Sequence, residues 1–165
     1  MKRILITIGL ALLVAACTTT EQKIDKLWSE AEQYRLEEKL YESVHALLEI
    51  IDQYPEHPRA GEAQFQIAEL YLNDVRDFDL AIVEFTKVLN GYSDTEMAAK
   101  ALFMIGYIEA NYLQAYSDAL NHYAQFLNKF PDHELIPSVE YEIESLADIQ
   151  TEIATLNALA QSENN

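Results

Sequence analysis

Apolar residues along most of this chain recur at the three- and four-residue spacing of helices. Val44, Leu47, Leu48 and Ile51 fall at i, i+3, i+4 and i+7, which places them on one stripe of a helix. Half of the 165 residues are apolar, and only four are glycine and four proline. The helical spacing and the few glycines and prolines predict an all-α protein. A single core is expected, because a typical domain has about 100 to 150 residues.

The helical pattern repeats every 38 residues. Each copy has a small residue (Ser43, Ala81, Ala119), a bulky residue four positions later (Leu47, Phe85, Tyr123) and then a turn (Tyr54 and Pro55, Tyr92 and Ser93, Phe130 and Pro131). An earlier helix in each copy has its own small residue at Ala31, Ala68 or Gly106, which would let the two helices come close. We therefore expect three antiparallel helical hairpins over residues 25–134, stacked so that one core runs through them.

Beyond the third copy, the pattern predicts a helix over residues 135–148 that covers the open end of the stack. Val139, Ile143 and Leu146 would face the last hairpin. Residues 149–165 form a C-terminal tail in this interpretation. Its apolar residues could form another amphipathic helix (Ile149, Ile153, Leu156 and Leu159), and residues 161–165 are expected to be disordered.

The chain begins like an exported protein. Lys2 and Arg3 precede a run of 13 apolar and small residues, which is too short for a spanning helix of about 20 residues and is typical of a signal peptide over residues 1–16. Cys17, the only cysteine, follows directly and has no disulfide partner in the chain. An ordinary secretory signal with a chance cysteine is the alternative.

The junction Leu13, Val14, Ala15, Ala16, Cys17 resembles the lipobox of bacterial lipoproteins. The resemblance implies that Cys17 is lipidated, that the chain is cut before it, and that residues 17–24 form a short tether. Two or three acyl chains hold a protein to a bilayer almost permanently. Because Thr18 rather than Asp follows the cysteine, the resemblance implies an anchor in the outer membrane, facing the periplasm.

The chain is strongly acidic, with 11 basic and 28 acidic residues. Removal of Lys2 and Arg3 with the signal peptide leaves nine basic against 28 acidic residues, a net charge of −19. Such a field repels nucleic acids and anionic lipid surfaces, so membrane attachment must be covalent. The acid excess is either a solvated surface or a surface for a basic partner.

The sequence contains no catalytic motif. The four histidines at 45, 57, 122 and 133 lack the spacing of a metal site, no glycine loop could hold a phosphate, and Gly91, Tyr92, Ser93 is a turn. His57 and His133 share one position of the repeat and are interpreted as turn residues. We predict a protein that is not an enzyme, with no metal, cofactor or small-molecule substrate.

The series of small, aromatic and proline positions over Lys26 to Glu134 resembles the tetratricopeptide repeat, which implies a right-handed α-solenoid of three hairpins plus a capping helix. With the lipobox, the chain is similar to the outer-membrane assembly lipoproteins of the BamD family, although it has fewer repeats. This implies a periplasmic scaffold for protein–protein interactions in outer-membrane protein assembly. The alternative is an envelope coordinator or pilotin-like lipoprotein that acts with Tol, cell-wall or secretin machinery.

In tetratricopeptide arrays the first helices line a groove that holds partner segments. The resemblance implies that eight first-helix residues line it here: Trp28, Glu32, Phe65, Glu69, Asn73, Phe103, Tyr107 and Asn111. Aromatic rings beside acids and amides suit an envelope protein or peptide with apolar anchors and Lys or Arg. The aromatic residues could equally be core, and the two asparagines could simply end their helices.

Overall fold

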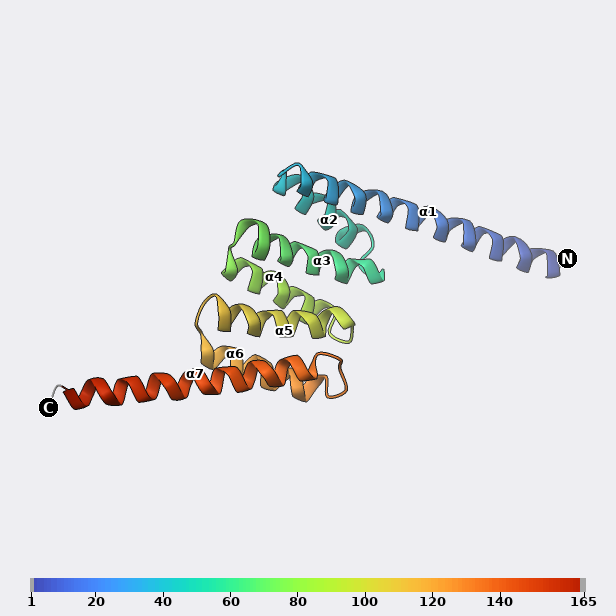
Figure 1. Ribbon diagram of the computed structural model, residues 1–165. Helices are drawn as coiled ribbons and strands as arrows, with labels where there is room; N and C mark the ends of the chain where they lie inside the picture. Colours follow the sequence, from blue (N-terminus) through green and yellow to red (C-terminus); the bar gives the residue numbers. More distant parts are fainter. Residues whose placement is uncertain (1, 164–165) are drawn as a thin grey trace.

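The computed structural model describes the backbone of residues 2–163 and the side chains of residues 19–156. Within residues 2–163 the chain is all-helical, and Figure 1 shows its helices in order. They are α1 (Lys2–Leu36), α2 (Leu40–Gln53), α3 (Pro58–Leu70), the π-helical turn η1 (Tyr71–Val75), α4 (Phe78–Gly91), α5 (Glu96–Asn111), α6 (Tyr116–Lys129) and α7 (Ile136–Glu163).

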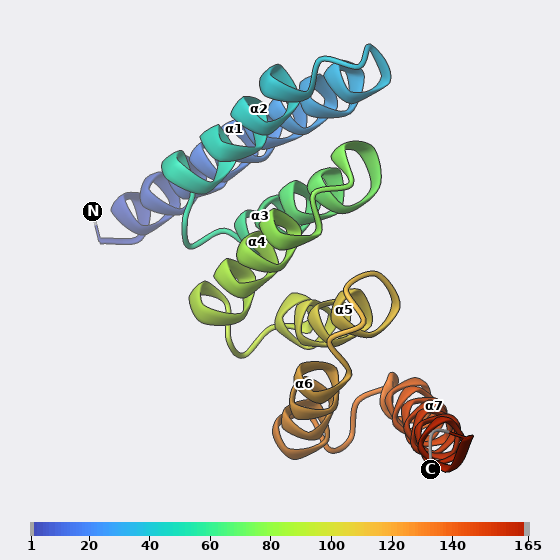
Figure 2. The same cartoon turned by 90° about the vertical axis from the view of Figure 1, so that its left-hand side faces the viewer.

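The helices form three stacked hairpins followed by a single helix. α1 packs on α2, α3 on α4 and α5 on α6, and each second helix also contacts the first helix of the next unit. α7 closes the stack by packing on α6 and α5, as the side view in Figure 2 shows. The predicted fold class, an α-solenoid of three hairpins with a C-terminal capping helix, is confirmed.

The first helices lie on the inner side of the stack. α3 contacts α5, and α5 contacts α7. Among the described residues, no contact of comparable extent joins α2 to α4 or α4 to α6. In a curved stack, the helices that approach one another most closely are those on the inner side of the curve. The surface of α1, α3 and α5 is therefore the inner face of this array.

Small residues lie where the two helices of each hairpin cross. All six that the sequence singled out are buried: Ala31, Ser43, Ala68, Ala81, Gly106 and Ala119. In the first unit the Ser43 hydroxyl donates a hydrogen bond of 2.8 Å to the backbone carbonyl of Ala31. The bulky residues Leu47, Phe85 and Tyr123 fill the adjoining space with no exposed surface. The spacing of small and bulky positions therefore predicted the helix contacts correctly.

The turn inside each hairpin contains one residue in the left-handed conformation. These residues are Glu38, Arg76 and Gln114, with φ of 58°, 61° and 56°, and they lie 38 residues apart. The next residue in each turn donates its N–H to a carbonyl five or six positions earlier, as in helix ends of the left-handed type. The sequence reasoning missed this feature because the left-handed residue is not glycine in any of the three turns.

The turns between hairpins are closed by the residues at the His57 position. His57 and His133 accept hydrogen bonds at Nδ1 from the N–H groups two residues later, and Thr95 accepts one from Ala98. The histidines also reach the preceding first helix, since the Nε2 atoms of His57 and His133 lie 2.9 and 3.0 Å from Glu21 and Glu96. They are turn residues, as predicted, and they also link neighbouring units.

Both ends of the array differ from the predicted boundaries. α1 is already helical across residues 17–24, where a tether was expected, because Ile24 is buried in the core with Leu47 and Ile67. α7 continues through residue 148 to Glu163, because the apolar stripe runs on through Ile149 and no helix breaker interrupts it. No helix in the described part has the length and apolar character to cross a membrane.

Candidate partner-binding face

The eight residues predicted for the groove all lie on first helices or directly after one. Trp28 and Glu32 are on α1, Phe65 and Glu69 on α3, Asn73 in η1, and Phe103, Tyr107 and Asn111 on α5. The hydrogen bonds and ring contacts among them lie within single units: Trp28 with Glu32, Phe103 with Tyr107, and Tyr107 with Asn111. Within the described part of the chain, no hydrogen bond or ring contact between two of these eight residues joins one unit to the next.

The three aromatic residues of the predicted row are half-buried. Phe65 meets Phe85 edge-on with ring centroids 5.0 Å apart, and Phe103 lies 6.0 Å from Tyr123. Trp28 packs against the core of the first unit in the same way. Each ring thus contacts the core on one side and keeps an accessible side. These residues can therefore be part of the core and of a binding groove at the same time.

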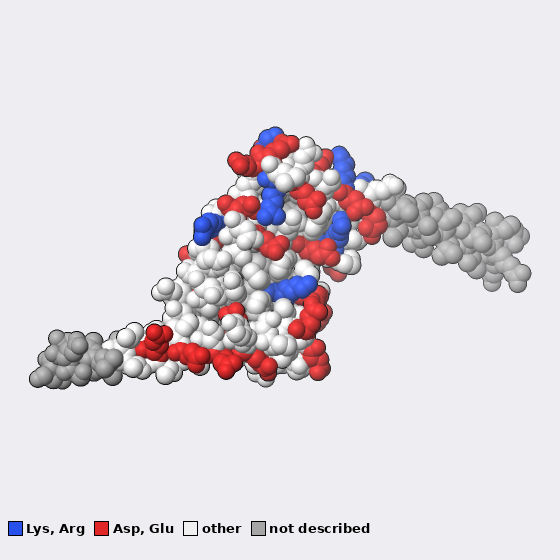
Figure 3. Space-filling view, viewed as in Figure 1, with Lys and Arg blue, Asp and Glu red and all other residues white. Residues whose placement is uncertain are grey.

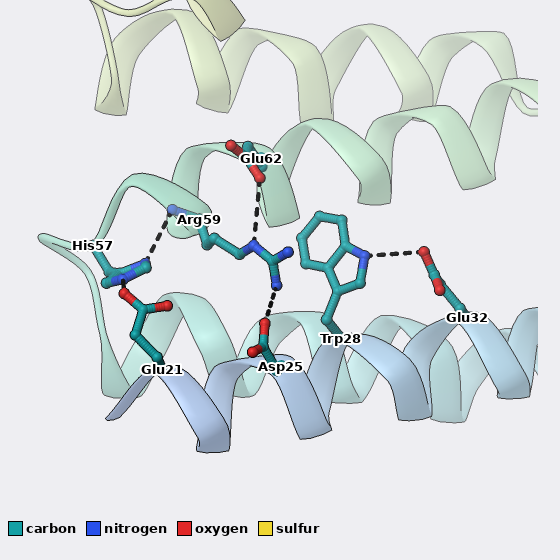
Figure 4. Close-up of polar contacts among 7 residues, drawn as sticks. All are labelled: Glu21, Asp25, Trp28, Glu32, His57, Arg59 and Glu62. Carbon is teal, nitrogen blue, oxygen red and sulfur yellow. Dashed lines mark hydrogen bonds and ion pairs between the residues drawn. The ribbon is translucent and has the colours of Figure 1, made fainter. Parts of the chain in front are cut away.

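Trp28 is the most constrained of these residues, as Figure 4 shows. Its indole N–H donates a hydrogen bond of 3.0 Å to Glu32, and the guanidinium carbon of Arg59 lies 4.8 Å from its ring centre. Arg59 also donates to Asp25 at 3.0 Å and lies 3.7 Å from Glu62. The cation over this tryptophan therefore comes from the chain itself, whereas a partner cation was expected.

Arg59 and Asp25 were missed by the sequence reasoning for a physical reason. The repeat was read from positions that agree between copies, and the positions equivalent to Arg59 are Met97 and Leu135. A contact that occurs in one unit only leaves no periodic signal. The contact joins α1 to the start of α3, so it fixes the first unit against the second.

The second unit carries a half-buried carboxyl, that of Glu69, on the inner face. Burial raises the pKa of Glu69, and the nearby Arg35 opposes the rise only in part. Arg35 itself donates a hydrogen bond of 2.9 Å to Asp74 in η1. A shallow cavity of about 300 Å³ lies here, lined by Arg35, Glu38, Leu40, Leu70, Asp74 and Val75. Asn73, which precedes Asp74 in the chain, is exposed and does not line the cavity.

The third unit presents the most aromatic part of this face. Tyr107 lies 6.2 Å from both Phe103 and Tyr112, and Tyr112 stacks on Phe78 at 4.4 Å. Asn111 is the last residue of α5 and donates its amide to the carbonyl of Tyr107 at 3.0 Å. Asn111 thus lies at the end of its helix, and no described residue donates to its exposed side-chain carbonyl oxygen, which can therefore accept a hydrogen bond from a partner.

Charge is unevenly distributed over the array. In the space-filling view of Figure 3, Lys and Arg lie mostly over the first units, while an acidic row follows α7. The chain has no Lys or Arg after Lys129. Among the described residues, no group of three or more His, Cys, Asp or Glu side chains could hold a metal ion. The side chain of Cys17 lies outside the described residues.

Two parts of the sequence match known protein families. Residues 1–18 match the prokaryotic membrane lipoprotein lipid attachment site, and residues 100–133, which form α5 and α6, match the tetratricopeptide repeat. The chain thus carries a lipoprotein signal that indicates membrane anchoring, and a repeat that indicates a protein-interaction scaffold. Comparison with curated proteins gave no match.

Solved structures share the fold. A tetratricopeptide repeat protein from Parabacteroides merdae superposes with a TM-score of 0.60 at 18% identity, over 79% of this chain and 48% of that protein. The TPR2B domain of yeast Sti1, in complex with pHsp70, superposes with a TM-score of 0.58 at 15% identity, over 77% of this chain and 98% of the domain. This is the tetratricopeptide-repeat fold. The chain therefore spans less than half of the length of the first of these proteins.

Proposed function

We propose that this protein is held in the outer membrane by acyl chains on Cys17, faces the periplasm, and binds segments of envelope proteins on its inner face during outer-membrane protein assembly. The lipid attachment site supports the anchor. The stack of three hairpins supports a binding role, because such arrays offer a long surface and no enclosed pocket. The Sti1 domain, which has the same fold, was solved with a protein partner.

The observation that carries the binding site is the half-buried aromatic row on the first helices. Phe65 and Phe103 combine a side fixed by the core with an accessible side, and the half-buried Tyr107 lies beside Phe103. Rigid aromatic rings give large contact area at little entropic cost, which makes them good anchors. Glu32 and Glu69 on the same helices add negative charge, so the proposed partner segment has apolar anchors and Lys or Arg.

Crosslinking in native envelopes tests the binding site. The wild type is compared with a Phe65→Ala, Asn73→Ala, Asn111→Ala variant, after circular dichroism has shown that the variant is folded. Val83→Ala is the control, because Val83 is exposed on the second helix α4. We expect barrel-assembly proteins to be captured by the wild type and the control but lost by the triple variant. Capture of Tol, secretin or cell-wall proteins would instead identify a coordinator or pilotin-like role.

The anchor is tested separately with a Cys17→Ser variant. We expect the wild type to carry the added mass of acyl chains and to fractionate with outer membranes on a density gradient. The variant is expected to lack that mass and to leave the membrane fraction, because the two or three acyl chains supply the whole membrane affinity. Wild type found in the inner-membrane fraction would contradict the proposed location.

A further inference from the structure

The last part of α7 extends past the array and carries an apolar stripe with no cover. Val139 and Leu146 are buried against α6, and Ile149 is half-buried in the same cluster. Ile153 and Leu156 continue the stripe at i+4 and i+7 from Ile149 but are 43% and 58% exposed. Figure 1 shows this segment projecting beyond α5 and α6. The packing stripe of the cap therefore continues beyond the point where other described residues of the chain pack on it.

The neighbouring surface of α7 can be buried without losing hydrogen bonds. The Thr151 hydroxyl donates to the carbonyl of Ala147 at 2.9 Å, and the Thr155 hydroxyl donates to the carbonyl of Thr151 at 2.9 Å. Polar groups that are already bonded within the helix add little desolvation cost when another helix covers them. Ala147 and Ala154 on this surface are small enough for a close approach.

The remaining surface of α7 is acidic. Residues 136–165 contain six acidic residues and no Lys, Arg or His. Four of the six, Glu140, Glu144, Asp148 and Glu152, are exposed and follow one another at four-residue spacing, and none has an ion-pair partner in the described part of the chain. Like charges at this spacing repel one another along a helix. Figure 3 shows the resulting acidic row.

We propose that the face of α7 from Ile149 to Leu156 docks a basic amphipathic helix of a partner protein. The exposed stripe has the i, i+4, i+7 spacing of helix-in-groove contacts. A partner helix with Lys and Arg beside its apolar stripe would relieve the repulsion along the acidic row. A second copy of α7 would instead add acid to acid, so this surface does not favour self-association.

The position of this surface is independent of the inner face and of the anchor. α1 leaves the array at one edge and α7 leaves it at the opposite edge (Figure 1). A chain held through Cys17 would thus present α7 on the side away from its anchor. An anionic lipid surface would also repel the acidic row. The docking surface is therefore suited to a protein and adds a second contact to the proposed scaffold.

Site-specific photo-crosslinking on the full lipoprotein in its native envelope tests this proposal. A photoreactive amino acid replaces Gln150, which is exposed beside the stripe, and in a control it replaces Asp132 in the turn before α7. The crosslinked segment is mapped by mass spectrometry. We expect a segment with net positive charge and apolar residues at helical spacing, captured from Gln150 only. Adducts to a second copy, to lipid or to an acidic segment would overturn the proposal, and so would no adduct.

Charge and apolar variants sharpen the test. Glu144→Gln, Asp148→Asn and Glu152→Gln together remove three exposed charges and are expected to lower the crosslink yield about tenfold. Ile153→Ser with Leu156→Ser is expected to do the same, while the thermal unfolding curve stays unchanged because both side chains are exposed. Val83→Ala, at an exposed position of α4, leaves this yield unchanged, which shows that the loss is specific to the α7 surface. A yield unaffected by the charge and apolar variants would contradict the docking surface.

Discussion

The α-carbon of Gly106 lies against the ring of Tyr123, so closely that a Cβ at position 106 would be 2.7 Å from Cε1 of the tyrosine. The equivalent pairs in the other units are Ala31 with Leu47 and Ala68 with Phe85. The only unit with tyrosine at the second-helix position is thus the one with glycine at the first-helix position. In each hairpin the sizes of these two residues are matched, so that the two helices can approach closely where they cross.

Gly106→Ala is therefore expected to destabilise the protein. Overpacking a filled core costs about 1–3 kcal/mol, and alanine regains about 1 kcal/mol of helix propensity over glycine. The net loss is expected to be up to about 2 kcal/mol in the free energy of urea unfolding. Adding Tyr123→Leu, which copies the first unit, should restore part of this loss. A stable Gly106→Ala variant would mean that the Tyr123 ring moves aside freely.

Tyr123→Phe is expected to stabilise the protein. The Tyr123 hydroxyl is buried and has no hydrogen-bond partner among the described residues, and burial raises the pKa of this phenol. An unsatisfied buried polar group costs about 1–3 kcal/mol, so its removal should raise the free energy of unfolding by about 1 kcal/mol. Tyr107→Phe is the control, since Tyr107 is half-exposed and should change stability by less than about 0.5 kcal/mol. A loss of stability in Tyr123→Phe would reveal a partner for the hydroxyl.

The hairpins could be predicted from the sequence because their contacts recur. Small residues such as Ser43 and Ala81 stand at the same position in each copy. Their recurrence predicts where the two helices of each hairpin cross. The capping helix was predicted to end at Asp148, whereas Ile149 and Ile153 continue its apolar stripe on the same face and α7 runs on to Glu163. An acidic residue on the outer side of a helix does not end it.

The candidate face was less predictable, because its decisive contacts occur only once. The repeat placed Trp28 on the inner face, but it contained no information that Arg59 lies over the indole ring. The same holds for Phe78 at the start of α4, which stacks on Tyr112 at the end of α5 in the next unit. Contacts between long side chains of different units depend on the exact offset of the helices, which hydrophobic spacing does not specify.

The stability of the protein is expected to depend on the protonation of Glu109. Glu109 is only 8% exposed, and its carboxyl group shares a hydrogen bond of 2.7 Å with the ring of His122. Burial raises the pKa of Glu109, and the hydrogen bond with His122 lowers it only in part. A group with a raised folded-state pKa binds its proton more tightly when folded, so the wild type loses stability as pH rises through that pKa.

Comparison with Glu109→Gln isolates this effect. The amide has a similar shape and does not titrate, so the free energy of unfolding of the variant minus that of the wild type should increase as pH rises from below the ordinary glutamate pKa of 4.5 to above the raised value. Urea unfolding at a series of pH values measures it. A difference that stays constant over this range would show that Glu109 has an ordinary pKa.

His57→Ala is expected to cost about 1 kcal/mol of stability, because it removes the side chain that accepts a hydrogen bond at the start of α3. His57→Thr is the matched variant, since Thr95 performs the same capping at the start of α5. It should cost less than about 0.5 kcal/mol, because the contact with Glu21 that it loses is largely exposed. Equal losses of stability in both variants would show that His57 stabilises the protein through its contact with Glu21 and not through capping.

Gln114→Gly is expected to stabilise the last hairpin. Gln114 has φ of 56°, a conformation that costs an ordinary residue about 1–2 kcal/mol and glycine nearly nothing. Glycine also gives the unfolded chain more freedom, which costs about 0.4–1 kcal/mol, so the net gain should be about 0.5 kcal/mol or slightly more. Gln114→Val is the opposite test, because a β-branched residue tolerates this conformation poorly and should destabilise the protein. Thermal unfolding of the two variants should move in opposite directions, and a loss in the glycine variant would show that the Gln114 side chain stabilises the turn by a contact of its own.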